Sequence, residues 1–167
     1  HENDLRDHAR GRIYRVVWRD AKNPAALQKL NPTDATQLTK ALNSDVQERR
    51  LFAQRLLVEG KHTATIDGLK KLVTANDGSV EALHALWTLQ GLNACDDATM
   101  TSALLAKDAR LRRNAVRALK ADESGQKLYF GSGTVNDPDL VTRLASLVKL
   151  TEFNTTPEIQ TLVKKLA

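Results

Sequence analysis

Cysteine is almost missing from this chain, with one residue among 167, and this scarcity excludes several kinds of site. Cys95 alone can form no internal disulfide, no thiolate metal cluster and no CxxCH haem attachment within these residues. Aromatic residues make up only 4% of the sequence. A composition poor in aromatics and rich in leucine and alanine favours helices over sheets.

Long apolar runs and a strong charge imbalance are missing as well. No apolar run approaches the roughly 18 residues of a membrane span, and the first residues are too charged for a signal peptide. The net charge of +5 comes from 25 basic and 20 acidic residues, which is a mild excess. Such a surface is compatible with an acidic partner, although an ordinary mixed, solvated surface is the preferred explanation.

What the sequence does contain is a periodic pattern. Four alanines recur at intervals of 32, 30 and 30 residues, and a leucine follows each of the first three after four residues. A period of this size is typical of helical solenoids. The sequence therefore predicts an all-α fold, an α-α superhelix of three to four helix pairs. The repeated residues are Ala53, Ala85, Ala115, Ala145, Leu57, Leu89 and Leu119.

Apolar spacing and capping residues place the individual helices. We expect a solenoid at 23–167, preceded by an extended segment at 1–22. The helices are expected at 24–30, 32–42, 46–59, 62–75, 80–94, a segment opened by Asp96 and Asp97, 109–120, a short helix near 124–130, a segment opened by Asp137 and Pro138, and 157–167. Thr33 or Asp34 is expected to cap the helix at 32–42. Phe52 is expected on the apolar face of the helix at 46–59, and Leu105 in the apolar stripe of the helix opened by Asp96 and Asp97.

Both ends of the chain suggest a larger protein. Residues 12–18, RIYRVVW, favour a strand, which either lies irregularly on the helices or belongs to a sheet in a neighbouring domain. The chain starts at His1 without a methionine, and nothing after residue 167 can cover the apolar stripe of the last helix. We therefore expect a longer parent protein.

Residues 121–136, ADESGQKLYFGSGTVN, interrupt the period with three glycines. The segment is either a recognition loop or a degenerate repeat whose aromatic residues, Tyr129 and Phe130, fill the gap. The helix that follows is expected to be amphipathic, because its apolar residues occur at helical spacing. These residues are Leu140, Val141, Leu144, Leu147, Val148 and Thr151.

No residue pattern predicts catalysis, a cofactor or a metal. His84 has no second ligand at helical spacing, Cys95 has no flanking cation, and Asp96 with Asp97 suits a helix cap. A charged chain end explains the ligand-like spacing among His1, Asp4, Asp7 and His8.

The strongest candidate surface is a basic stripe on the helix expected at 109–120. Its residues could bind an acidic partner or neutralise phosphates of a nucleic acid. Aromatic stacking residues are scarce, so nucleic acid is the disfavoured alternative and a protein partner is preferred. The stripe consists of Arg110, Arg113, Arg117 and Lys120.

Five segments of the chain carry a resemblance to known families. They are RDHARGRIYRVVW (6–18), RRLFAQRLLVEG (49–60), ALHALWTLQGLNACDD (82–97), RRNAVRAL (112–119) and DPDLVTRLASL (137–147). With these segments the paired helices resemble HEAT repeats, of the armadillo-like class. More specifically, the chain resembles the region after the β-propeller in PVC-type haem-binding and membrane-bound dehydrogenase-like proteins.

The resemblance implies a helical connector in a periplasmic or otherwise extracytoplasmic redox protein. In that family a sugar dehydrogenase-like propeller precedes the helical region, and a cytochrome c domain follows it. This sequence contains neither the propeller body nor CxxCH. We therefore expect a non-catalytic scaffold that takes no cofactor and no small-molecule substrate. Its partner is expected to be a protein, either a flanking domain of the same parent chain or another molecule.

Overall fold

The described part of the computed structural model is helical. It covers residues 29–75, 78–153 and 161, and these residues form eight α-helices and two short 3-10 turns with no strand. The all-α prediction is therefore confirmed over these residues. The predicted strand at 12–18, most of the predicted helix at 24–30, the boundary at residue 22 and most of the last predicted helix lie outside them.

Most observed helix bounds agree with the predicted ones to within three residues. The 3-10 turn η1 occupies the start of the helix predicted at 62–75, and the turn η2 follows the Gly-containing segment. In chain order the elements are α1 (Ala35–Ala41), α2 (Gln47–Glu59), η1 (Thr63–Thr65), α3 (Ile66–Ala75), α4 (Val80–Gly91), α5 (Asp97–Leu104), α6 (Ala109–Ala118), α7 (Glu123–Ser132), η2 (Thr134–Asn136) and α8 (Leu140–Glu152).

Side-chain caps start most of these helices. A helix leaves its first backbone N–H groups without an internal partner, and a short polar side chain before the first turn can accept from one of them. Of the two residues expected to cap α1, Thr33 and Asp34, the cap is Asp34, and of Asp96 and Asp97 the cap of α5 is Asp96. The full set of capping residues is Asp34, Ser79, Asp96, Asp108, Asp122 and Asp139.

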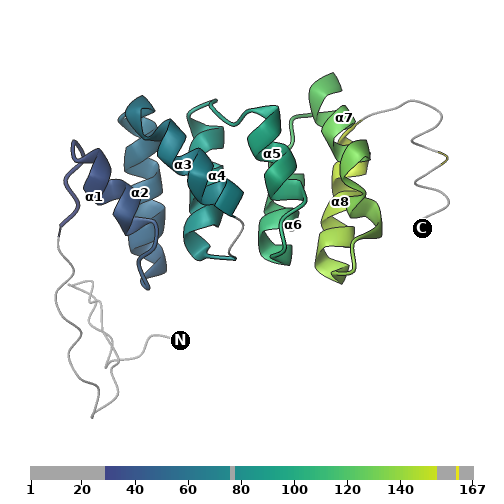
Figure 1. Ribbon diagram of the computed structural model, residues 1–167, viewed down its shortest axis with the longest axis horizontal. Coiled ribbons are helices and arrows are strands. Elements are labelled where there is room, and N and C mark those ends of the chain that lie inside the picture. Colours follow the sequence, from purple (N-terminus) through teal and green to yellow (C-terminus); the bar gives the residue numbers. More distant parts are fainter. Residues whose placement is uncertain (1–28, 76–77, 154–160, 162–167) are drawn as a thin grey trace, which may run out of the picture.

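The helices lie in two layers that follow chain order (Figure 1). Consecutive helices pack together in the pairs α1 with α2, α3 with α4 and α5 with α6. In one layer α2 contacts α4, α4 contacts α6 and α6 contacts α8, while in the other α3 contacts α5 and α5 contacts α7. α4 therefore has neighbours on three sides, which explains why apolar residues occupy more than one of its faces.

Three of the four periodic alanines lie buried on successive helices of the first layer, whereas the fourth, Ala145 on α8, is half-buried. Ala53, Ala85 and Ala115 lie on α2, α4 and α6, and all three are completely buried. Gly91 permits a close approach at the end of α4, because an added Cβ would lie 2.6 Å from a methyl group of Val58 on α2. Small side chains at these contacts allow close packing between helix axes.

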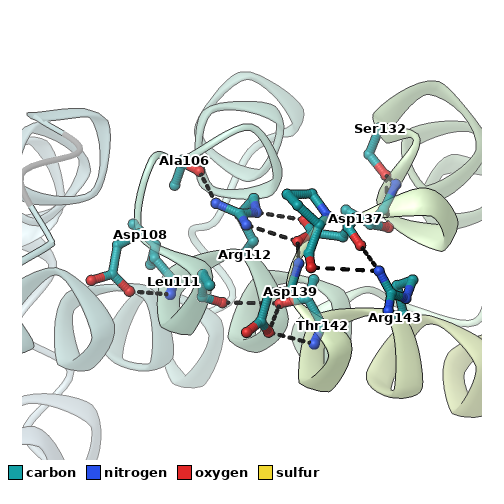
Figure 2. Close-up of polar contacts among 12 residues, drawn as sticks. Ala106, Asp108, Leu111, Arg112, Ser132, Asp137, Asp139, Thr142 and Arg143 are labelled. Carbon is teal, nitrogen blue, oxygen red and sulfur yellow. Dashed lines mark hydrogen bonds and ion pairs between the residues drawn. The ribbon is translucent and has the colours of Figure 1, made fainter.

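A second regularity involves arginines in the first turn of three helices in this layer. Arg50 on α2, Arg112 on α6 and Arg143 on α8 each donate from Nη1 to the backbone carbonyl six residues earlier, at 2.6 to 2.8 Å. Figure 2 shows Arg112 also reaching forward to Asp137, in the loop that precedes α8. The guanidinium groups therefore fix the loops that lead into their own helices, and Arg112 fixes the next loop as well.

The irregular segment at 121–136 contains a longer helix than its glycines predicted. α7 spans Glu123–Ser132 and packs on α5, and Gly133 ends it in the left-handed conformation with φ 68°. Gly125 permits a close approach, because an added Cβ would lie 2.0 Å from the carbonyl oxygen of Lys120. The segment therefore contributes α7 to the second layer, and its 3-10 turn η2 packs on α8. This agrees with the degenerate-repeat interpretation and corrects the expectation of only a short helix.

Tyr129 fills the space between α7 and α8, as expected for a core aromatic residue. Its hydroxyl donates to the carbonyl of Ser146 at 2.9 Å, and its ring meets the edge of Phe153 with centroids 5.1 Å apart. Phe130 was expected to be buried too, but it is exposed. The reason is geometric, since adjacent helical residues point about 100° apart.

Three further expectations about apolar faces and caps are corrected. Phe52 lies one position before buried Ala53 and is exposed, and Leu105 lies beyond the last turn of α5 and is exposed as well. Asp137 does not cap α8, because the helix begins two residues later with Asp139 as its cap. Asp137 is instead held by Arg112, which leaves the capping position to Asp139.

Candidate functional site

The outer face of α8 is an apolar surface in contact with solvent. Its large side chains occur at helical spacing, and the exposed fractions are 59% for Leu140, 48% for Val141, 51% for Leu144 and 62% for Val148. An apolar stripe of this kind ordinarily faces a protein core. On α8 the apolar stripe points away from the protein core.

The opposite face of α8 packs on α6, and it is polar and small. Thr142, Ser146 and Lys149 are buried there together with Leu150. The Thr142 hydroxyl shares its proton between the Asp139 carboxylate at 2.8 Å and the carbonyl of Ala109 at 3.2 Å, and the Lys149 ammonium donates to the carbonyl of Leu119 at 2.9 Å. Leu119 follows the last residue of α6, so its carbonyl has no partner within that helix. These contacts explain why α8 turns its polar face inward.

The two hydrogen bonds also fix the direction of the helices. The first turn of α8 lies beside the first turn of α6, and the last turn of α8 lies beside the end of α6. α6 and α8 therefore run parallel. Figure 2 shows the first of these junctions, where Thr142 and Asp139 lie close to the start of α6.

A groove of about 500 Å³ opens beside this apolar face. α8 contributes Val141, Leu144, Ala145 and Val148 to one wall, and Lys149 and Glu152 lie at its end. The other wall is formed by Arg113 and Arg117 of α6, with Trp87 of α4 beyond them. The Trp87 ring is held in place because its indole N–H donates to the Asn114 side chain at 3.0 Å.

The predicted basic stripe is divided by the structure. Arg113 and Arg117 line the groove. Arg110 turns away from it, because its guanidinium donates to both carboxylate oxygens of Asp108 and to the carbonyl of Gly78 at 2.7 Å. Lys120 follows the end of α6 and lines a separate small pocket with Cys95. Two of the four predicted residues therefore share one site.

The two groove arginines have different electrostatic environments. The charge of Arg113 acts on Asp139, where it contributes to a lowered pKa that arises mainly from the hydrogen bond of the Thr142 hydroxyl. Arg117 is exposed and forms no ion pair with another described residue. Glu152 is the one carboxylate among the groove-lining residues, and it accepts from Lys149 at 2.6 Å.

His84 is part of a structural network between α2 and α4. Its Nε2 accepts from Nε of Arg50 at 3.1 Å, so Nδ1 carries the proton and donates to Gln54 at 2.8 Å. Burial, followed by the charge of Arg50, lowers the pKa of His84. This network favours neutral imidazole.

Cys95 and its two acidic neighbours also have structural environments. Burial and then the charge of Asp96 raise the pKa of Cys95 to about 11, so its thiol remains protonated near neutral pH. Asp96 caps α5 and pairs with Lys70 at 2.6 Å, and the Lys70 bond is the largest cause of its pKa falling to about 2. Asp97 accepts from the Ser124 hydroxyl.

The groove itself was missed by sequence reasoning, although the apolar pattern of α8 was recognised. The available signal lay on the other face of the helix, where Thr142, Ser146 and Lys149 also recur at helical spacing. Both faces are continuous, and one of them has to be exposed. Among the described residues no group of His, Cys, Asp or Glu is suited to hold a metal ion.

No helix in the described ranges is both long and apolar enough to cross a membrane. Comparison of the chain with protein-family models, with curated proteins and with solved structures finds no match.

Proposed function

We propose that this chain is a non-catalytic helical-repeat module that binds another protein through the groove between α6 and α8. The observation that carries the proposal is the exposed apolar face of α8, at Leu140, Val141, Leu144 and Val148. Exposed apolar clusters rimmed by polar groups are typical of protein-binding surfaces. The arginines and Trp87 along the groove are residue types that contribute strongly to such interfaces.

We further propose that the helix pairs stack as a HEAT-like α-α superhelix. Two regularities support this interpretation: the buried alanines that recur on successive helices of one layer, and the arginines that bond six residues back in three of those helices. Each repeat of a solenoid buries its apolar surface against its neighbours. A stack of this kind would hold flanking domains at a fixed separation.

The resemblance noted for the sequence gives one cellular context for such a module. In this proposal the chain connects domains of a larger extracytoplasmic redox protein, and the partner in the groove is a flanking domain or a second protein. The activity would then belong to the other domains.

Nucleic-acid binding is the second candidate function, and the predicted basic stripe is the feature that favours it. Two observations make a protein the better occupant of this site. Only Arg113 and Arg117 of the stripe line the groove, and the opposite wall is formed by Val141, Leu144 and Val148. Clustered cations increase the affinity of a protein for a phosphate backbone, whereas aliphatic side chains add little to it.

Photo-crosslinking of the full chain tests the proposal. A photoreactive residue at position 151, adjacent to the groove on exposed α8, should crosslink a partner in extracts of the cells that produce the protein. The Leu144→Asp/Val148→Asp double variant should lose that crosslink. Leu105→Asp should keep it, because Leu105 is equally exposed but lies on the other layer.

Two outcomes would contradict the proposal. The first is a crosslinked partner that the double variant retains, since the apolar wall would then make no contribution. The second is a mobility shift of duplex DNA that weakens steeply with added salt and is abolished by Arg113→Glu/Arg117→Glu. That second result would establish the nucleic-acid alternative.

A further inference from the structure

We infer that the groove between α6 and α8 binds an amphipathic α-helix that carries acidic side chains along one edge. This inference rests on the proposed function and specifies the chemistry of the partner. It is drawn from the shape of the apolar wall and from the charge of the opposite wall.

The dimensions of the apolar wall suit about two turns of a partner helix. Leu140, Val141, Leu144 and Val148 lie within nine residues of α8, so the first and last are roughly 12 Å apart at 1.5 Å per residue. Their spacing forms a ridge of the kind that packs into the surface of another helix. A partner with leucine-like residues three and four apart would cover this ridge.

An extended peptide is a poorer occupant than a helix. Strand-like peptides bind mainly by adding to an exposed sheet edge, where backbone hydrogen bonds supply affinity. The described ranges of the chain contain no strand, and both groove walls are helices. An α-helix satisfies its own backbone hydrogen bonds and needs from the groove only apolar and charged contacts.

The charge of the groove selects acidic side chains. Arg113 and Arg117 are four residues apart on α6, so their guanidinium groups lie one turn from each other along the same wall. Carboxylates at positions i and i+4 of a partner helix match this separation. Among the described residues that line the groove, Glu152 alone carries a carboxylate, and its pairing with Lys149 limits its repulsion of an acidic partner.

Arg117 should contribute more than Arg113 to binding. Neither arginine forms an ion pair with a described carboxylate, but Arg117 is exposed, whereas Arg113 is half-buried and its charge also acts on Asp139. A partner carboxylate should therefore add most to the binding affinity when it lies beside Arg117. This difference between two neighbouring arginines makes the inference specific to this groove.

Fluorescence anisotropy with designed peptides tests the inference on the full chain. The acidic probe is a labelled helical peptide of about 16 residues, with leucines three and four apart and two glutamates flanking them at i and i+4. The neutral probe replaces both glutamates with glutamine. We expect the acidic probe to bind at least about tenfold more tightly, a difference within the range of a close charge pair at an interface.

Variants of the chain locate the binding to the groove. Arg117→Glu should lower the affinity for the acidic probe by about tenfold or more, and Arg113→Glu should lower it by less. Val148→Asp should abolish binding of the probe. A probe with lysines in place of its glutamates should bind Arg117→Glu better than it binds the unaltered chain. Arg55→Glu and Leu105→Asp are the matched controls, because both residues are exposed and lie away from the groove.

Equal affinity for the acidic and neutral probes, or no binding of either, would overturn the inference. Two other occupants would overturn it as well. A second copy of the chain occupies the groove if sedimentation shows a dimer and the Leu144→Asp/Val148→Asp variant is a monomer. The chain's own 157–167 segment competes for the groove if Leu162→Asp strengthens binding of the acidic probe.

The failure of this inference is distinguishable from the failure of the proposed function. If the crosslink depends on the α8 side chains while the two probes bind equally, the proposed interaction module is supported and the inference of an acidic helix is wrong. If the crosslink is independent of those side chains, the proposed function itself fails.

Discussion

Arg112 and Asp137 form a two-bond ion pair that links α6 to the loop before α8 (Figure 2). Nε and Nη2 of Arg112 donate to the two carboxylate oxygens at 2.5 and 2.8 Å, and both side chains are largely shielded from solvent. The carboxylate also accepts from the backbone N–H of Asp139, the cap of α8. This pair therefore sets the position at which α8 begins, and with it the groove.

Asp137→Ala should lower the free energy of unfolding by about 3 kcal/mol, the lower end of the cost of breaking a buried pair. The lower end applies because Arg112 keeps its bonds to the carbonyls of Ala106 and Lys107. Urea unfolding measures the change. Glu59→Gln removes the exposed pair with Arg55 and should change stability by less than about 1 kcal/mol. Equal effects of the two substitutions would contradict this reading.

Acid should weaken the same contact. The Arg112 guanidinium holds the pKa of Asp137 below its usual range, so the unfolded chain takes up the proton more readily than the folded chain. The contribution is fully present above an unfolded pKa of about 4 and is lost as pH falls through the lower folded value. The urea midpoint of the unaltered chain should therefore fall more steeply below about pH 4 than that of Asp137→Ala.

His84 should make stability sensitive to pH in a higher window. Burial and Arg50 lower its pKa, so between the folded value and an unfolded value of about 6.5 the unfolded chain binds the extra proton. Stability should be full above about pH 6.5 and should decrease as the pH falls toward the folded pKa. An NMR titration of the His84 ring and urea midpoints at several pH values measure both quantities.

His84→Gln is the variant that isolates this effect. It removes the titrating group at the junction with Arg50 and Gln54, so the fall in the urea midpoint on mild acidification should become smaller. An imidazole that titrates at or above its ordinary value would contradict the prediction.

Two glycines of α7 should respond oppositely to alanine. At Gly125 the new Cβ would lie 2.0 Å from the Lys120 carbonyl oxygen, so Gly125→Ala must displace the backbone and should cost about 1 to 3 kcal/mol. At Gly131 nothing lies within 4 Å of the new atom, and alanine should stabilise the helix by about 0.5 to 1 kcal/mol. Thermal and urea unfolding of both variants provide the measurement. Stabilisation by both substitutions would show that helix propensity alone governs α7.

Cys95 should react slowly with an alkylating reagent in the folded chain. Its pKa is raised from 9.0 to about 11, so the reactive thiolate is about 100-fold less abundant at pH 8 than in a chain with an ordinary thiol. Iodoacetamide labelling followed by mass spectrometry gives the rate, and the urea-unfolded chain is the control. Similar rates in the two states would contradict the buried, protonated thiol.

Local signals in the sequence predicted much of the helical structure. The caps at Asp34 and Asp96 and the buried alanines on α2, α4 and α6 depend on short-range rules, namely a polar side chain before a first turn and a small residue where helices meet. The cap of α8 was misplaced because Asp137 and Asp139 both suit it. Arg112, distant in sequence, selects between them.

The candidate site was predicted in part. The sequence identified Arg113 and Arg117, because charged residues opposite an apolar stripe on one helix indicate an exposed face. It could not exclude Arg110 and Lys120, whose directions depend on Asp108 and Gly78 in one case and on a neighbouring pocket in the other.

The sequence by itself determined that this protein is helical, where most of its helices begin and which small residues lie between them. Those properties follow from interactions within a few residues and from a repeated spacing. Only the tertiary structure decided which face of α8 is buried. On one face of α8, Thr142 and Lys149 donate to backbone carbonyls at the start of α6 and just after its end. The aliphatic face of α8 is consequently exposed, beside Arg113 and Arg117.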